Sequence, residues 1–423
     1  NFLVDGKLRF SVGQTGNDRI SNYGSYTTFN FGGEFYNGAS SAALNTTLGN
    51  SEIKWETTTQ QDAGIDLTLL RGRLNVTADY YKKTTSNLLY NKALPVETAF
   101  TNVYVNLGTI ENTGWEFSVA GTPISNKKLT WTVNANFSMQ NGIIKELANH
   151  TPFISGDKWL VREGGRIGDF YVYKNLGVYQ YNESNAYTPD GTRLTPVFDN
   201  GTFQGYTLNG KTYTGDVISK YSNGLKLLGG DTEWADINND GVIDDKDRLI
   251  AGNGVPKYFF GFTNNIRYGS FSLNVLFSGN LGYQVYNGVK NGQNTNSSTY
   301  SPPSWDAIHY SWQKPGDISI FPYFPFKDVR GGIRNGLNSM YIEDGSFVRL
   351  ASARLTYNLS PSIAGRAKLK GVAIFIYGNN LLTWTNYSWY DPEFSSSNIL
   401  QPGNDNGKYP KRREYGFGVN LNL

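Results

Sequence analysis

Hydrophobic and polar residues alternate with a period of two along several segments of the chain. In residues 129–140 the odd positions are apolar and the even positions polar, and residues 415–423 repeat this pattern. Residues 271–278 follow it as well, except that Leu276 falls on the polar face. A period of two is that of a β-strand, and these lengths approach the roughly 9 to 11 residues of a tilted membrane-spanning strand. The pattern predicts strands with one apolar and one polar face.

Alternation alone fits a soluble β-sandwich as well as a membrane β-barrel. The lengths of the connections between strands distinguish the two folds. Several links are tight, at residues 70–73, 125–128 and 267–270. Others are long and rich in Gly, Asn, Ser and Tyr, at residues 141–255, 287–338 and 386–408. Links of that length are unusual in compact soluble domains. Short turns on one rim and long loops on the other favour an outer-membrane barrel.

Ten strands satisfy this arrangement when every tight turn is periplasmic and every long link extracellular. We expect barrel strands in residues 1–141, an extracellular insertion in residues 142–255, and further barrel strands in residues 256–423 with extracellular loops 287–338 and 386–408. The predicted strands are residues 5–15, 53–70, 73–89, 104–123, 127–141, 256–268, 271–285, 341–359, 371–385 and 409–423. An open ten-stranded sheet would leave two unpaired edges in hydrocarbon, so we expect the remaining strands from the same longer polypeptide.

Composition agrees with an all-β protein. The 423 residues include 29 Tyr, 24 Phe, 48 Gly and no Cys. Mean hydropathy is -0.44, and the sequence has no apolar run of about 18 residues, so a transmembrane helix is excluded. The formal net charge of +3 is too small to indicate a nucleic-acid partner. The chain opens on residues typical of a strand under way, with no signal peptide, and we expect it to be a fragment.

Residues 236–247 have the spacing of a calcium-binding loop. Side-chain oxygens fall at its positions one, three, five, nine and twelve, a backbone carbonyl at position seven, and Gly241 at the sharp turn. The predicted Ca²⁺ ligands are Asp236, Asn238, Asp240, Val242, Asp244 and Asp247. The alternative is a polar turn that only caps local backbone groups. We expect a structural role, with the metal stiffening an insertion that has little apolar core of its own.

Six short motifs resemble the C-terminal part of SusC/RagA-type TonB-dependent transporters, which are outer-membrane barrels of Bacteroidetes. The motifs lie at residues 54–66 with 79–83, 106–116, 236–257, 341–350, 378–383 and 390–393. Two positions depart from the usual pattern: the chain ends in Leu423 where an aromatic residue is common, and Trp115 stands where a smaller apolar residue is usual.

The resemblance implies a 22-stranded antiparallel transmembrane barrel with an N-terminal plug, and the plug is not included in this chain. It also implies active import of oligomeric nutrients across the outer membrane, with oligosaccharides the first choice and oligopeptides the alternative. The implied partners are a SusD-like surface lipoprotein that closes over the loops as a lid, TonB acting through a segment missing from this chain, and outer-membrane lipid.

Aromatic residues gather in loop 287–338. They are candidates for substrate or lid contact, or for packing the loop on itself; the chosen residues are Tyr300, Trp305, Trp312, Tyr323 and Phe324. A second group, Trp384, Tyr387, Trp389 and Tyr390, is expected to form an interfacial girdle.

An enzyme is not expected. The sequence has 2 His, and neither lies near a recognisable nucleophile motif. Two alternatives stay open: a surface β-sandwich adhesin that binds glycans, and a barrel-borne hydrolase with paired carboxylates.

Overall fold

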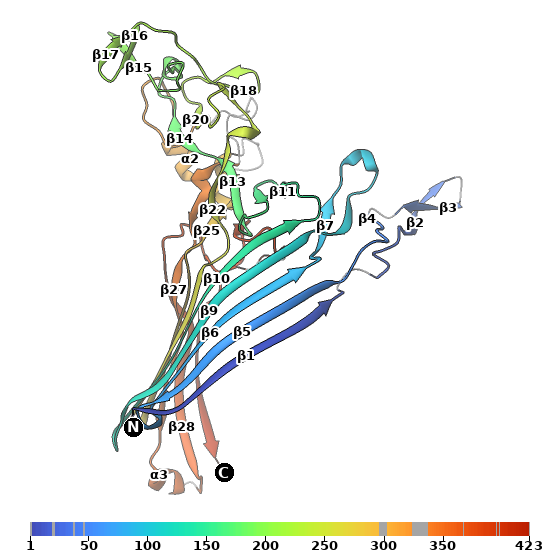
Figure 1. Ribbon diagram of the computed structural model, residues 1–423. Helices are drawn as coiled ribbons and strands as arrows, with labels where there is room; N and C mark the ends of the chain where they lie inside the picture. The colour runs from blue at the N-terminus through green and yellow to red at the C-terminus, as the bar shows by residue number, and fades with distance from the viewer. Residues whose placement is uncertain are drawn as a thin grey trace.

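One large antiparallel sheet dominates the computed structural model, which describes residues 2–18, 22–36, 39–44, 47–295, 303–323, 337–366, 368–394, 396 and 398–422. Its ten strands pair strictly in chain order (Figure 1), which confirms the number and order of the predicted strands. They are β1 (Leu3–Asn17), β5 (Glu56–Leu69), β6 (Leu74–Ser86), β9 (Gly108–Ser125), β10 (Leu129–Leu147), β23 (Tyr258–Tyr268), β24 (Phe271–Leu281), β27 (Phe347–Asn358), β28 (Gly371–Thr385) and β30 (Glu414–Asn422). Residues 104–106, 284–285 and 342–344, predicted as parts of these strands, lie instead in small separate sheets.

Both chain ends and the short turns lie at the lower rim of this sheet in Figure 1, and the long links rise from the upper rim. The turns are tied together: the Gly269 amide donates to the Lys128 carbonyl at 2.9 Å, and the Lys370 amide to the Asn422 carbonyl at 2.8 Å. The rim also carries α3 (Pro361–Arg366) and η1 (Leu70–Gly72). The sheet thus has one continuous short-turn rim, as the alternation of link lengths predicts.

The pairing register gives the sheet two chemically different faces. Phe137 of β10 lies opposite Phe117 and Phe260, and the exposed face continues through Leu8 and Phe417, which are 82% and 84% exposed. An exposed apolar face of this size on a single sheet is what lipid covers. A soluble β-sandwich would bury this face against a second sheet, so the adhesin alternative is wrong.

Aromatic rings form a row on the lipid face across four strands. Tyr80, Trp115, Phe117, Phe137 and Tyr258 follow one another with ring centroids 5.1, 6.0, 6.5 and 5.9 Å apart. Such rings contribute cross-strand packing, and aromatic residues are typical of the membrane interface. Trp115, which departs from the family pattern, is a member of this row.

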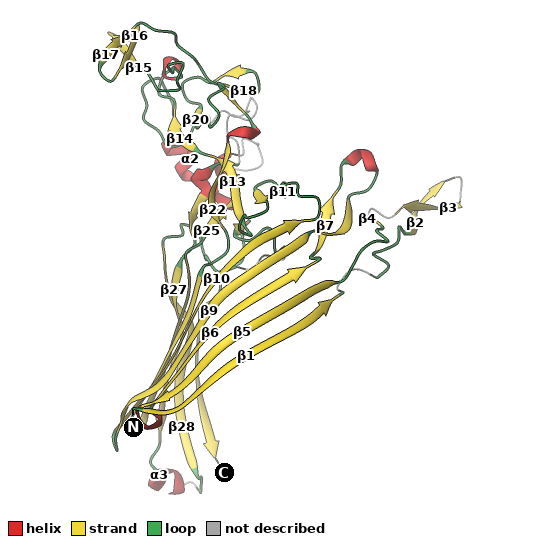
Figure 2. Cartoon of the chain, viewed as in Figure 1, coloured by secondary structure: helices red, strands yellow, loops and turns green. Residues whose placement is uncertain are grey.

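The links above the upper rim fold into small sheets (Figure 2). Their strands are β11 (Phe153–Ser155), β12 (Trp159–Val161), β13 (Asp169–Tyr173), β22 (Arg248–Asn253), β14 (Asn175–Val178), β20 (Thr232–Trp234), β15 (Thr195–Asp199), β16 (Thr202–Leu208), β17 (Lys211–Tyr213), β18 (Tyr221–Ser222), β19 (Leu225–Lys226), β21 (Val242–Ile243), β25 (Gln284–Asn287), β26 (Ile342–Asp344), β29 (Asn404–Asp405), β2 (Phe29–Tyr36), β3 (Ala39–Leu44), β4 (Thr47–Leu48), β7 (Leu89–Ala93) and β8 (Asn102–Asn106). Short helices complete the links: η2 (Val96–Thr98), η3 (Asn182–Ser184), η4 (Asp245–Asp247), α1 (Gly288–Thr295), α2 (Trp305–Tyr310) and η5 (Ser339–Tyr341).

Contrary to the expectation from the sequence, the insertion has an apolar core of its own. Trp234 and Tyr179 are buried together with four further residues: Tyr173, Tyr187, Leu227 and Ile243. A second cluster, which includes Ile144, Ile167 and Leu400, joins the upper end of β10 to the insertion and to residues 386–413. The core residues come from segments with no shared periodicity, so the sequence pattern does not predict this core.

In the described part of the chain, no helix is both long and apolar enough to cross a membrane.

Candidate lumen-facing site

The face of the sheet opposite the lipid face carries charged residues that pair across strands. Arg9 of β1 lies between two carboxylates: its Nε is 2.7 Å from Asp66 of β5, and its Nη2 is 2.8 Å from Asp79 of β6. Two residues farther along β1, the Ser11 hydroxyl donates to Asp62 at 3.2 Å, and Gln60 donates to the same carboxylate at 2.9 Å. The polar positions of three neighbouring strands therefore carry two adjacent bonded groups, Arg9 with Asp66 and Asp79, and Ser11 with Asp62 and Gln60, which together make up the inner-face network.

A glycine makes room for this network. Gly64 lies between Asp62 and Asp66 on β5, and a Cβ at this position would meet the Asp79 carboxylate at 1.9 Å and the Arg9 guanidinium at 3.0 Å. A larger residue would therefore displace the ion pair between Arg9 and Asp79.

The described part of the segment between β28 and β30, within residues 386–413, folds over the same face. It is held by Arg349 of β27, a side chain 2% exposed, whose Nη2 is 2.6 Å from Asp391 and whose Nη1 is 3.0 Å from Glu393. The Tyr283 hydroxyl adds a 3.0 Å bond to the Pro392 carbonyl. Because Arg349 pairs with Ser278 in the register, on the polar face, its ion pairs draw this segment inward across the sheet.

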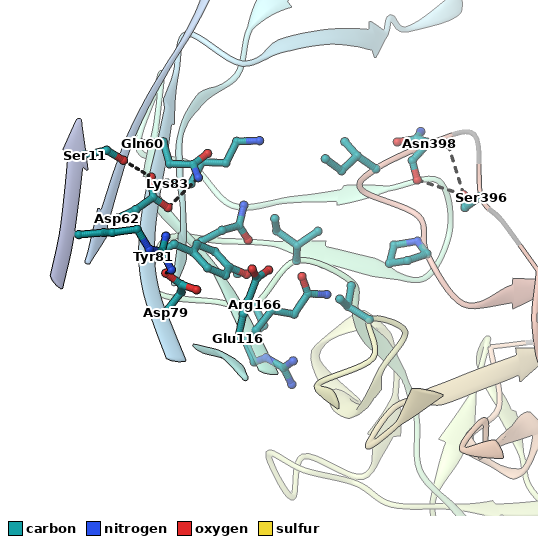
Figure 3. Close-up of a pocket in the computed structure, with 18 residues that line it drawn as sticks. Ser11, Gln60, Asp62, Asp79, Tyr81, Lys83, Glu116, Arg166, Ser396 and Asn398 are labelled. Carbon is teal, nitrogen blue, oxygen red and sulfur yellow. Dashed lines mark hydrogen bonds and ion pairs between the residues drawn. The ribbon is translucent and has the colours of Figure 1, made fainter. Parts of the chain in front are cut away.

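A cavity of about 780 Å³ lies between the sheet and the inward segment. In Figure 3, Ser11, Asp62, Asp79, Tyr81, Lys83 and Glu116 line one side, and Ser396 and Asn398 face them from the segment. Further lining residues are Arg9, Gln60, Asn112, Gln140, Gly142, Arg166, Ile167, Val255, Ile399 and Pro402. Arg9, Lys83 and Arg166 balance Asp62, Asp79 and Glu116 in charge, and amides fill the space between them. The wall therefore presents many hydrogen-bonding groups and has no net charge.

The loop predicted to hold calcium folds into a tight, internally bonded turn. Gly241 has φ +79°, the left-handed conformation that the sixth position of such a loop requires. The Asp236 carboxylate accepts from the Gly241 amide at 3.0 Å. Asp247 is fully buried and accepts from the amides of Ile237 and Asp244, both at 2.8 Å.

The fit to a cation is mixed. Oδ1 of Asp236 is buried without a hydrogen-bond partner, which suits a metal ligand. Asn238, Asp240 and Asp244 each accept from a backbone amide two residues on, the bonding of a polar turn. Among the described residues, no three His, Cys, Asp or Glu side chains converge as a metal cluster. Burial raises the pKa of Asp247, and the charges of Asp236 and Asp240 add to the effect. Calcium binding, with Val242 contributing its carbonyl, stays a prediction.

The aromatic candidates of loop 287–338 divide into two kinds. Trp312 is buried, and its Nε1 donates to the Gln180 carbonyl at 3.0 Å, so it packs the loop onto the insertion. Trp305 is exposed and stacks on His309 with centroids 4.0 Å apart, and Tyr323 is also exposed. These two remain available for contact with a substrate or a lid. Tyr300 and Phe324 lie outside the described residues.

The girdle prediction is wrong for Tyr387, whose side chain is 5% exposed and packs with Tyr283 and Val285. Its hydroxyl donates to Asp405 at 2.7 Å, inside the protein. Trp384 keeps its place on the lipid face, where it stacks on Phe277 at 6.4 Å. Tyr387 is two residues past the end of β28, where the chain has already turned inward.

Sequence reasoning did not select Arg349 or the charged positions of β1, β5 and β6 as site residues. A signal was present, since Arg9, Asp62, Asp66 and Asp79 all fall on polar positions of strands that are otherwise alternating. The sequence gives no indication that Ser396 and Asn398 return to face them.

The fold and the charged inner face define the wall of an outer-membrane β-barrel, seen here as ten of its strands. Residues 5–160 match the family described as TonB dependent receptor-like, beta-barrel. TonB-dependent receptor P39 of Formosa agariphila is 41% identical over 98% of this chain and 40% of its own length. TonB-dependent receptor SusC of Bacteroides thetaiotaomicron is 25% identical over all of this chain and 38% of its own length.

Among solved structures, that of the RagAB peptide transporter superposes with a TM-score of 0.75 at 22% identity, over all of this chain and 41% of that chain. The chain thus spans about two fifths of the length of the relatives it matches. Over its whole length the chain is similar to TonB-dependent receptors of the SusC/RagA type, and its fold is that of part of an outer-membrane barrel.

Proposed function

We propose that the chain forms part of the passage of an active importer of oligomeric nutrients across the outer membrane. The observation that carries the proposal is the 780 Å³ cavity between the inner wall and Ser396, Asn398, Ile399 and Pro402. The names of its relatives support a role in TonB-dependent uptake. Import would depend on TonB, through a part of the protein outside this chain, and on a SusD-like lipoprotein closing over the extracellular loops.

The lining suits neutral oligomers with many hydrogen-bonding groups. Three cations and three carboxylates cancel, and amide and hydroxyl groups supply donors and acceptors of both kinds. Oligosaccharides present such groups along their whole length, and oligopeptides do so through their backbones. Oligosaccharides are the first-choice substrate class. Oligopeptides are the second, and RagAB, which shares the fold, is named a peptide transporter.

The test is mass spectrometry of what co-purifies with the full-length protein from native outer membranes in mild detergent. We expect a SusD-like lipoprotein and a bound oligosaccharide or peptide. In parallel, Asp62→Asn together with Glu116→Gln should lower the retained ligand. Glu146→Gln, an exposed residue of β10 that does not line the cavity, is the matched control. Release of the protein by salt alone, with no lipoprotein and no ligand, would overturn the proposal.

A further inference from the structure

The short-turn rim of the sheet is basic in three of its four turns. Its four turns are residues 70–73, 126–128, 269–270 and 359–370, the segments between paired strands. They carry seven cationic residues and no Asp or Glu: Arg71, Arg73, Lys127, Lys128, Arg366, Lys368 and Lys370. The whole chain has 38 basic and 35 acidic residues, so the rest of it, with 31 basic and 35 acidic, has a net charge of −4. Positive charge is concentrated on this rim.

The rim cations are free to meet a partner. All seven are exposed, and none takes part in an ion pair within the part of the chain that the structure describes. Some cations elsewhere do pair with a carboxylate, among them Arg9, Arg193, Arg248 and Arg349, so what sets the rim apart is that its cations are unpaired and no Asp or Glu lies in its turns.

The backbone fixes these turns beside one another. The Thr122 amide of β9 donates to the Arg73 carbonyl at 2.9 Å, which ties the first turn to the strand leading to the second. The second and third turns are joined at Lys128 and Gly269, and the Asn358 amide of β27 donates to the Ser270 carbonyl at 2.8 Å. The cations thus form a row along one edge and are not scattered.

Directly above this row the lipid face is apolar and aromatic. Phe271 and Tyr357, each next to a turn, pack with centroids 4.9 Å apart, and Tyr268 beside them is 61% exposed. Ile363 of α3 is 51% exposed among the basic residues of the last turn. Aromatic residues at the end of a lipid-facing strand mark the depth of the membrane interface, so the cations just beyond them lie at the level of lipid headgroups.

We propose that the short-turn rim binds anionic phospholipid headgroups of the leaflet that faces the periplasm. Charge complementarity supports this occupant, because seven unpaired cations meet headgroup phosphates at the depth where the apolar belt ends. Each Lys or Arg near an anionic membrane surface adds attraction, and screening by salt weakens it. Bound lipid would hold the four turns at a fixed depth in the membrane while substrate passes along the inner face.

The experiment is native mass spectrometry of the full-length protein in detergent, with added phosphatidylglycerol or phosphatidylcholine. The wild type should retain phosphatidylglycerol preferentially, and Arg71→Gln, Arg73→Gln, Lys127→Gln and Lys128→Gln together should lower that retention by about tenfold. Lys54→Gln, Lys92→Gln, Lys211→Gln and Arg413→Gln together make the same change of charge at exposed residues on the other side of the membrane. This control should retain the lipid as the wild type does.

Each other outcome counts against the proposal. Equal retention in the rim variant and the control would overturn it, as would equal loss of both lipids. Displacement of phosphatidylglycerol by inorganic phosphate at similar concentration would identify a free-anion site, and capture of a periplasmic protein without lipid would identify a protein interface.

A second variant, Lys368→Gln with Lys370→Gln, covers the case in which the first one fails to fold. High salt should weaken retention in the wild type more than in either rim variant.

Discussion

Arg349 of β27 and Asp391 of the 386–413 segment form a buried ion pair, 2.6 Å long, on the inner face of the sheet. Both partners have further bonds: Arg349 Nε donates to Thr383 at 3.1 Å, and Asp391 accepts from the Lys411 amide at 3.0 Å. The pair links strands β27 and β28 to a segment that lines the cavity. Its energetic effect is felt when one partner is removed, because the other charge then stays buried alone.

Arg349→Met should release the 386–413 segment. We expect a loss of about 3–5 kcal/mol in the free energy of local opening, the usual cost of leaving a buried carboxylate unpaired. Hydrogen exchange of the amides of residues 404–411 measures the opening. Arg354→Met is the matched control, since Arg354 lies on the same strand and covers Phe375 without an ion pair. Equal protection in both variants would show that the ion pair does not hold the segment.

Removal of calcium should loosen the loop at residues 236–247 if it binds the metal. The wild type should then resist proteolysis of the insertion better in calcium than in chelator, and Asp240→Ala with Asp244→Ala should abolish the difference. Asp216→Ala, an exposed acidic residue of the same insertion, should keep it. Identical digestion of the wild type in calcium and in chelator would leave the loop as a polar turn, stabilised only by its own amides.

Alkaline pH should destabilise the insertion before the barrel wall. The Tyr187 hydroxyl donates to Glu233 at 2.8 Å, and burial, with the nearby charges of Tyr179 and Glu233, raises the pKa of the Tyr187 phenol well above its ordinary value. Above about pH 10 the unfolded chain releases this proton while the folded chain keeps it, so the free energy of unfolding falls as the pH rises. Phenolate absorbance and protease sensitivity, followed together, should show ionisation and opening at the same pH.

Tyr187→Phe separates this effect from general alkaline damage. The variant should be less stable at neutral pH by about 1–3 kcal/mol, because Glu233 loses a buried donor. Its stability should fall less than that of the wild type as the pH rises above about 10. An unchanged slope would place the alkaline sensitivity in other groups.

Gly418→Ala should disturb the pairing of β28 with β30. A Cβ at Gly418 would lie 2.5 Å from the ring of Phe375, and the ring of Tyr377 covers Gly416 in the same way. We expect a cost of about 1–3 kcal/mol from overpacking, measured by the denaturant midpoint of the full-length protein. Gly13→Ala on β1, where nothing lies within 4 Å of the added Cβ, is the control. A midpoint equal to that of the control would mean that the Phe375 ring moves aside without cost.

Alternation determined most of the barrel wall, because a period of two has one structural solution when each face meets a different solvent. Residues 129–140 specify their own strand and its lipid face, and the register follows once neighbouring strands do the same. The tight turns fixed strand direction, and the motifs shared with the family fixed the type of barrel. The sharp turn at Gly241 was also readable, since the spacing of oxygen-bearing residues around one glycine is a local property.

Only the tertiary structure determined which residues of the wall and the loops come together as a site. Arg349 and Asp391 are 42 residues apart, and Arg9 is 57 residues from Asp66, so their pairing depends on strand order and on the return of a long loop. The core of the insertion, the burial of Tyr387 and the cavity beside Asn398 have the same origin. Such contacts follow no local period, because each needs the closure of a long loop whose cost and geometry are set by the whole fold.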